Sequence, residues 1–497
     1  MRVQSNALLL IAATLIALSG SAFAQKAYRP NVGSHVIRSP NSQSSRHPTF
    51  RPSLGNGGHG WRHPRWHGSS GIILRFPTRG VIVERHRHPR HRTHHHRVTH
   101  RKTHHRSRRI VQRRPSGVPP AGEHRYVPDE VLVEVANSTS TAEINALQRR
   151  YRLARLAQQQ FQLSGTTFYL WRIPDRRSVA TVVRVLERDA AVVSAQPNYQ
   201  FTLQQADAKP AAGNPAQYAV AKLRLLQAHV LAEGNGVRVA MIDSGVDVAS
   251  PELAGSITAT FDALPGSTRP HEHGTAIASL IAGHDKLLGV APKARILAVR
   301  AFDPAGTGTG AQGTTFSILK GLDWAVAHKA RVINMSFCGP NDPALHRSLA
   351  AAHAKGVVLV AAAGNGGPKS QPLYPAADGN VIAVTATDDG NELLAQANRG
   401  RYIDVAAPGA QILVAIPGGY EVSSGTSYSA AEVSGIAALM LQRAPRLRPD
   451  KLRNILERTA KDLGPKGRDS EFGAGLADAL AAVMTEGAVT AGGPRSK

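Results

Sequence analysis

The chain has 497 residues and a formal net charge of +26 at pH 7, a length that gives room for two or three domains. Its single cysteine, Cys338, excludes an intramolecular disulfide framework and argues against a metal site built from several cysteines. Most of the charge lies in residues 25–114, which contain 21 lysines and arginines and one acid, Glu84. The extreme charge therefore describes that segment and says little about the folded domains.

The first 24 residues have the pattern of an export signal. Arg2 precedes an apolar run over residues 7–18, and the segment ends in the small-x-small triplet at 22–24. The run is too short to span a bilayer comfortably. We therefore predict a signal peptide over residues 1–24 and a periplasmic or secreted mature chain without a transmembrane helix.

Residues 25–124 are rich in Arg, His, Pro, Gly and Ser and are predicted to be disordered. Within them, residues 85–114 alternate His and Arg almost without interruption. Three interpretations stay open: a solvated linker, a polycationic tether for anionic lipid, polysaccharide or nucleic acid, and a loose metal-binding tract. The shortage of aromatic residues weakens the case for specific nucleic-acid binding.

Residues 125–203 predict a small α+β domain. Ser140 and Glu143 form a capping-box pattern that opens a helix. The expected order is strand, helix, strand, strand, helix, strand, at 130–135, 140–151, 156–163, 167–173, 178–187 and 192–201. That order is typical of a ferredoxin-like domain. Residues 204–217, rich in Ala, Pro and Gln, are predicted to be an exposed linker.

From residue 218 onward, strands alternate with helices, which predicts a parallel sheet with helices on both faces. The expected strands are at 237–242, 294–299, 330–335, 357–363, 381–385 and 403–406. The expected helices are at 275–283, 316–328, 345–355, 433–441, 449–459 and 475–484, with Thr426 as the N-cap of the helix that follows it. The fold class is therefore α/β, preceded by the smaller α+β domain.

Chemically active side chains follow these predicted elements. Asp243, Ser336 and Asn365 come after strands, and His273 and Ser427 stand at helix starts. In an open α/β sheet such positions converge at one edge, where ligands bind. An Asp, a His, a Ser and an amide donor are what acyl transfer requires: an orienting acid, a base, a nucleophile and an oxyanion donor.

Four motifs, at 239–245, 273–275, 363–365 and 425–427, resemble those of the subtilisin-like serine proteases. The resemblance implies a catalytic domain over residues 218–487. It also implies Asp243 as orienting acid, His273 as general base, Ser427 as nucleophile and Asn365 as oxyanion donor. His271 lacks the Gly-Thr that follows the family's base, so we assign it no role. Tyr428, Ser429, Ala431 and Glu432 depart from the family's usual motif.

The resemblance further implies that the domain at 125–203 is a prodomain that assists folding and inhibits the enzyme. Polypeptide substrates would pair with two backbone segments, one containing Gly306 and Gly308 and the other containing Ser336, Phe337 and Cys338. Ala363 and Gly364 would form a pocket wall and Leu373 its base. A filled pocket predicts a preference for small residues, and hence self-cleavage within 204–216, after Ala206, Ala208, Ala211 or Ala212.

No cofactor is expected to be required. Relatives carry a calcium loop after the base, but here that stretch is shorter and Asp285 is its only acid, whereas calcium prefers six or more oxygen ligands. The alternative function, from another class, is a non-catalytic envelope protein that binds anionic polymers or metal through the His/Arg-rich segment.

Overall fold

The computed structural model describes residues 115–204, 217–266, 269–304 and 310–491. Residues 105–497 form one compact unit, which is described below. The predicted signal peptide at 1–24 and residues 25–114 of the predicted disordered segment lie outside the described residues, as do Gly306, Gly308 and the linker alanines. The rest of that segment, residues 115–124, is described, and the prediction of disorder is wrong there, because Gly117 N–H donates to Glu187 Oε1 at 2.5 Å.

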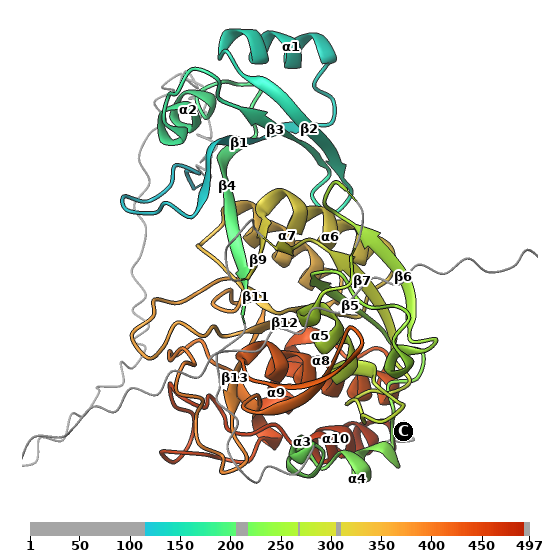
Figure 1. Cartoon of the computed structure of the whole chain (residues 1–497). Helices are drawn as coiled ribbons and strands as arrows, with labels where there is room; N and C mark the ends of the chain where they lie inside the picture. The colour runs from blue at the N-terminus through green and yellow to red at the C-terminus, as the bar shows by residue number, and fades with distance from the viewer. Residues whose placement is uncertain (1–114, 205–216, 267–268, 305–309, 492–497) are drawn as a thin grey trace, which may run out of the picture. The chain divides into compact units, whose positions relative to one another are not determined.

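The first part of this unit has the predicted ferredoxin-like order (Figure 1). Its elements are β1 (Tyr126–Ala136), α1 (Thr141–Arg150), β2 (Ala154–Phe161), β3 (Thr166–Arg172), α2 (Val179–Leu186) and β4 (Ser194–Leu203). The strands pair in the order β2-β3-β1-β4, all antiparallel. Ser140 and Glu143 form the predicted capping box at α1. Apolar faces of both helices pack on Trp171, Val131 and Val133 to form the core.

The second part is organised around a seven-stranded parallel sheet. Its strands lie in the order β14 (Val405–Pro408), β13 (Ile382–Thr387), β12 (Val358–Ala362), β10 (Val332–Met335), β5 (Arg238–Asp243), β7 (Arg295–Arg300) and β6 (Ile257–Asp262). Nearly all residues of β5, β10, β12 and β13 are buried, as expected when both faces of a parallel sheet are covered.

Helices cover both faces of this sheet (Figure 1). Val239 and Met241 of β5 join a core with α5 (Glu272–Ala282) and α8 (Thr426–Arg443). The alternate residues Ala240 and Ile242 join a second core with α6 (Thr315–Ala327) and α7 (Pro343–Ala354). Since successive side chains of a strand point to opposite faces, β5 is anchored from both sides, and its carboxyl end is held in place.

The remaining elements surround the sheet. They are α3 (Tyr218–Lys222), α4 (Leu225–His229), the 3-10 turn η1 (Pro251–Leu253), β8 (Asp303–Pro304), β9 (Ala311–Thr314), β11 (Phe337–Cys338), the hairpin β15 (Ile412–Ile416) and β16 (Gly419–Ser423), α9 (Pro449–Thr459) and α10 (Ala479–Ala491). In the part of the chain that the structure describes, no helix is long and apolar enough to cross a membrane.

Among the differences from the sequence-based expectation, two helix starts and one strand concern the parallel sheet and its carboxyl edge. Helix α8 begins at Thr426 itself, so Gly425 rather than Thr426 occupies the N-cap position. Helix α5 begins at Glu272, which places His273 inside its first turn. The edge strand β6 was not predicted: its exposed threonines, Thr258 and Thr260, break the apolar run that marks the buried strands.

Candidate active site

The predicted catalytic side chains are brought together by the ends of different elements. Asp243 is the last residue of β5, and His273 and Ser427 lie in the first turns of α5 and α8. Asn365 follows β12 in a loop, and Ser336 lies between β10 and β11. The parallel direction of β5, β10 and β12 places their carboxyl ends along the same edge, as predicted for a ligand-binding edge.

Asp243 and His273 form a buried pair. Oδ1 of Asp243 lies 2.8 Å from Nδ1 of His273, and the two side chains are 0% and 1% exposed. The same oxygen accepts from the backbone N–H of Ser244 at 2.8 Å. A buried carboxylate at this distance holds the proton on Nδ1. Nε2 of His273 is buried without a hydrogen-bond partner, so it is free to accept a proton.

Ser427 Oγ faces two backbone carbonyls, that of Gln204 at 2.5 Å and that of Ser336 at 3.1 Å. Ser427 is fully buried in this state. Gln204 lies 223 residues earlier in the chain, directly after β4. The predicted nucleophile is therefore in contact with the carbonyl of a peptide segment that belongs to the same molecule.

Asn365 presents one end of its amide to the protein and leaves the other end free. Its Oδ1 accepts from the backbone N–H of Thr426 at 3.1 Å and from Thr426 Oγ1 at 2.9 Å. Its Nδ2 is buried and has no partner. Leaving a buried amide N–H₂ group without a partner costs free energy. The two bonds from Thr426 to Oδ1 fix the orientation of this group. Asn365 can therefore donate to a charge that develops beside Ser427.

The segment leading to Gln204 lies extended between two strands. Leu203 and Thr202 of β4 pair antiparallel with Phe337 and Cys338 of β11. On the other side, residues 200–202 pair antiparallel with residues 312–314 in and beside β9. Gln204 continues the pairing, because its N–H donates to the carbonyl of Ser336 at 3.2 Å. The cleft is thus occupied by β-strand addition.

The other predicted cleft residues are placed as follows. Cys338 is buried, its Sγ contacts the carbonyl of Ala362 at 3.4 Å, and burial raises the pKa of its thiol. Ala363 is buried, with its carbonyl bonded to Asn398 and Tyr402. A methyl group built on Gly364 would lie 3.0 Å from Cδ1 of Leu373, which places Leu373 beside the wall glycine.

Phe201 fills an apolar position three residues before Gln204, the end of the segment. Its ring is 0% exposed and stands edge-on to Phe337, with centroids 5.8 Å apart. A Cβ added to Gly339 would lie 2.2 Å from Cδ1 of Phe201. A side chain at position 339 would therefore displace the ring, so glycine is needed there for close approach.

The sequence analysis gave His271 no role, but the structure places it in the network that holds the base. Its Nδ1 accepts from the backbone N–H of His273 at 3.2 Å and lies 3.1 Å from Ser244 Oγ. Ser244 Oγ in turn contacts Asp243 Oδ1 and accepts from Gly274 N–H. Burial and, next, the neighbouring His273 lower the pKa of His271. The signal in the sequence was its N-cap position two residues before the base.

The residues that depart from the family's usual motif lie in α8, directly after Ser427. Tyr428 is buried, donates to Ser423 Oγ at 2.8 Å, and lies with its ring centroid 6.3 Å from that of His273. Glu432 is 1% exposed, and neither of its carboxyl oxygens has a hydrogen-bond partner. Burial raises the pKa of Glu432 well above its ordinary value, because desolvation disfavours the charged carboxylate.

The shortened loop after α5 wraps around a carboxylate. Glu252 is buried, and its carboxyl oxygens accept from the backbone N–H groups of Asp285, Lys286 and Leu287 at 2.8–3.2 Å. Tyr420 OH donates to it at 2.7 Å. Converging N–H groups attract an anion and repel a cation, so these residues do not fit a calcium ion. Among the described residues, no cluster of three or more His, Cys, Asp or Glu is placed to hold a metal.

Comparison with known proteins assigns the family. Residues 234–475 match the family model described as the subtilase family, and residues 112–198 match that of the fervidolysin N-terminal prodomain. Over 263 residues the chain is 36% identical to subtilisin of Bacillus pumilus, an alignment that covers 50% of this chain and 92% of that protein. The chain belongs to the subtilase family.

Two further relatives of this subtilase differ in how much of their length they share with it. The minor extracellular protease Epr of Bacillus subtilis (strain 168) is 32% identical over 310 residues, which cover 59% of this chain and 47% of Epr. The crystal structure of fervidolysin from Fervidobacterium pennivorans, described as a keratinolytic enzyme related to subtilisin, matches with a TM-score of 0.63 at 24% identity. That match covers 75% of this chain and 63% of fervidolysin, and at this identity it shows the fold alone.

Proposed function

We propose that this subtilase is an exported serine endopeptidase that is made as a zymogen and cleaves its own chain after Gln204. The contact between Ser427 Oγ and the carbonyl of Gln204 carries the proposal. The sequence favoured cleavage after one of the alanines at 206–212. The contact supports the bond between residues 204 and 205 instead, at the very start of the predicted range.

The reaction follows from the positions of the side chains. Ser427 Oγ attacks the carbonyl carbon of Gln204 and transfers its proton to Nε2 of His273, while Asp243 stabilises the resulting imidazolium. Nδ2 of Asn365 and the N–H of Ser427 stabilise the oxyanion. His273 then gives the proton to the leaving amine of residue 205, which breaks the peptide bond. Water hydrolyses the acyl-enzyme by the same steps in reverse order.

The seated segment also indicates which substrates fit. Recognition of residues 200–204 is mostly backbone pairing, which tolerates many sequences. Two side chains are exceptions: Phe201 is enclosed by Phe337 and Gly339, and Oε1 of Gln204 accepts from the N–H of Asn365 at 3.0 Å. We therefore propose a preference for polypeptides with an aromatic residue four positions before the cut bond. Beside Leu373, the pocket next to the bond is proposed to favour small or medium side chains over Phe.

Contacts away from the cleft support an inhibitory role for the prodomain. Gln196 of β4 donates to Asp342 at 2.7 Å and accepts from Ala344 N–H at 2.9 Å, at the start of α7. Glu134 of β1 forms an ion pair with Arg347 at 2.8 Å. These bonds do not involve the scissile peptide, so they persist after it is cut. The prodomain would then remain bound as a product-like inhibitor.

Two further proposals concern ligands. Because the loop at 283–289 is satisfied by Glu252, we propose that the enzyme needs no calcium there, and that chelators leave its activity unchanged. We also propose that residues 85–114 tether the protein to anionic polymers in a sequence-independent way. Such binding should weaken steeply as salt rises and strengthen below about pH 6.5, as histidines become charged. Pull-down on anionic beads at several salt concentrations tests this.

The test of the main proposal compares wild type with Ser427→Ala. Wild type should label with a fluorophosphonate probe and yield a mature chain whose first residue is Gln205. Ser427→Ala should do neither and should accumulate as precursor. A variant that matures when purified alone would overturn the proposal. Absence of labelling in processed wild type would instead favour the non-catalytic binding protein.

A further inference from the structure

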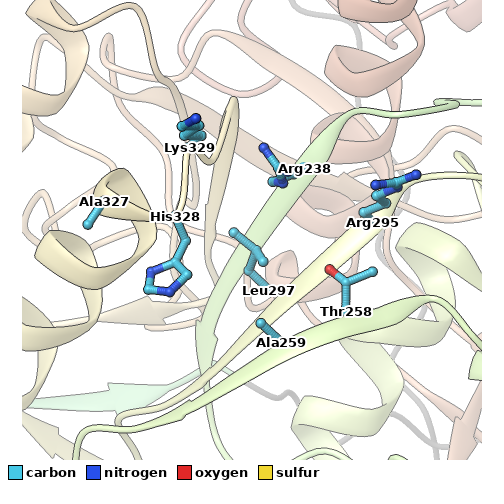
Figure 2. Close-up of a pocket in the computed structure, with 8 residues that line it drawn as sticks. All are labelled: Arg238, Thr258, Ala259, Arg295, Leu297, Ala327, His328 and Lys329. Carbon is cyan, nitrogen blue, oxygen red and sulfur yellow. The ribbon is translucent and has the colours of Figure 1, made fainter.

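A hollow of about 360 Å³ opens at the edge of the parallel sheet opposite the catalytic edge (Figure 2). It is formed by the first residues of β5 and β7, the start of β6 and the turn after α6. Its lining residues are Arg238, Thr258, Ala259, Arg295, Leu297, Ala327, His328 and Lys329. Because β5 begins at Arg238 and ends at Asp243, the hollow is separated from the catalytic residues by the length of the strand.

The lining contains three permanent cations and no carboxylate. Arg238, Arg295 and Lys329 form no ion pair and no side-chain hydrogen bond with any residue that the structure describes. Neighbouring cations behave differently: Lys293 pairs with Glu233, and Arg300 pairs with Asp262 and Asp303. Exposed cations elsewhere among the described residues, such as Arg446 and Arg448, also lack an ion pair. What distinguishes the hollow is that three such cations line one cavity.

The arrangement of these cations is unfavourable for the protein alone. Arg238 and Arg295 are direct register partners on neighbouring strands, so like charges stand side by side, which destabilises a sheet. Lys329 has a φ of 61°, a left-handed conformation that residues with side chains adopt infrequently. The fold thus holds three like charges around one hollow, and no described carboxylate pairs with any of them.

We propose that this hollow binds a phosphate- or sulfate-bearing ligand. Guanidinium groups bind such oxyanions through two parallel N–H···O bonds, and an oxyanion between Arg238 and Arg295 would offset their repulsion. His328 lies at the rim of the hollow, with its Nδ1 2.9 Å from the carbonyl of Trp324. The buried Leu297 provides an apolar floor. At ~30 Å³ for each water, the hollow has room for more than one oxyanion group.

Ligand-induced thermal stabilisation of the full chain tests the proposal. A Ser427→Ala background prevents self-digestion and keeps residues 25–114 present in every sample, so their own binding is common to all. With inorganic pyrophosphate at a hundred times its dissociation constant, the melting temperature should rise by about 3 °C. In R238Q/R295Q the rise should vanish, and the ligand-free protein should melt no lower than the parent. The matched control R446Q/R448Q removes the same charge from exposed residues elsewhere and should keep the rise.

A second probe, sucrose octasulfate, distinguishes the sources of the anion. A response to it alone indicates a sulfated glycan, and a response to pyrophosphate alone indicates a phosphate compound. Should the double variant fail to fold, Lys329→Gln replaces it and should raise the half-saturating concentration at least fivefold. An unchanged response in R238Q/R295Q or Lys329→Gln, or no response of the parent to either probe, overturns the proposal. No outcome depends on proteolytic activity.

Discussion

The two edges of the parallel sheet differ in how their charged side chains are paired. At the carboxyl edge, Asp243 is buried and bonded to His273 and Ser244. At the amino edge, Arg238 and Arg295 stand in register and form no ion pair with a residue that the structure describes. The same strand, β5, supplies a residue to both edges. The comparison shows that one strand can place a buried carboxylate at one end and a cation of the hollow at the other.

The largest effect is expected from substituting Asn365, whose Nδ2 is the donor without a described partner at the catalytic edge. Asn365→Ala removes Nδ2, and turnover should fall by roughly two to three orders of magnitude, as for loss of one oxyanion donor. Steady-state kinetics on a small peptide substrate measure this. R238Q/R295Q at the opposite edge should keep wild-type turnover. Equal losses in the two variants would abolish the distinction between the edges, and unchanged turnover in Asn365→Ala would assign the oxyanion to other donors.

The second-largest effect is expected on the free energy of unfolding, from substituting Glu252, around which the loop after α5 closes. Glu252→Gln replaces a carboxylate that accepts several bonds with a group that accepts fewer, which should cost about 1–3 kcal/mol of unfolding free energy. Burial acts to raise the pKa of Glu252, but the bonds from Tyr420 and the loop amides hold it below its ordinary value. The carboxylate's contribution is therefore present above about pH 4.5 and is lost as pH falls further.

Denaturant unfolding at pH 7 and at pH 3.5, with and without EDTA, measures this contribution. The difference between wild type and Glu252→Gln should shrink at the lower pH. A melting temperature of wild type that drops when EDTA is added would contradict the proposal that the loop needs no calcium.

A smaller effect is expected at His271, which acts through His273. His271→Ala removes the acceptor at the N-cap of α5, a loss of about 1 kcal/mol. The altered helix start should lower kcat by roughly fivefold. His271→Asn restores a capping oxygen, so it should recover most of the turnover. Recovery separates positioning from simple packing, because asparagine is much smaller than histidine. An alanine variant with wild-type kcat and pH profile would remove His271 from the network.

Glu432 gives the smallest expected effect, and its sign is opposite to that of Glu252. Because burial raises its folded-state pKa above the ordinary 4.5, the folded protein binds the proton more tightly than the unfolded chain. Stability therefore falls as pH rises above about 4.5. Glu432→Gln removes this dependence and should stabilise the protein at pH 8 by up to about 1 kcal/mol, measured by denaturant unfolding. A destabilising effect that grows with pH would mean that the carboxylate is ionised and partnered.

The sequence was sufficient for the elements whose signals are local. The capping box at Ser140, the apolar strands of the sheet and the motifs around Asp243, His273, Asn365 and Ser427 depend on residues close together in the chain. They predicted the fold and named the side chains that the structure gathers at one edge. The N-cap of α8 was misplaced by one residue, because Thr426 contacts Asn365 rather than the helix end.

The features that the sequence did not reveal depend on pairing between distant segments. Which residue of the linker meets Ser427 is fixed by the register of β4 against β9 and β11, and a slip of one residue would change it. The burial of Glu252 depends on the loop some 35 residues later, whose backbone N–H groups close on its carboxylate. Arg238 and Arg295 become neighbours only through the pairing of β5 with β7.

Strand β4 pairs with two parts of the molecule. Its first half pairs with β1 inside the prodomain, and its second half lies in the cleft between β9 and β11. After the cleavage proposed above, a folded prodomain would present that second half already extended, whereas an unfolded one must order it on binding. While the free prodomain is folded, losing part of its stability leaves the inhibition constant almost unchanged; once it is mostly unfolded, each further 1.4 kcal/mol weakens inhibition tenfold. Heating past the prodomain's own melting point would then release the mature enzyme abruptly, so that the latency of the zymogen is set by a thermal threshold.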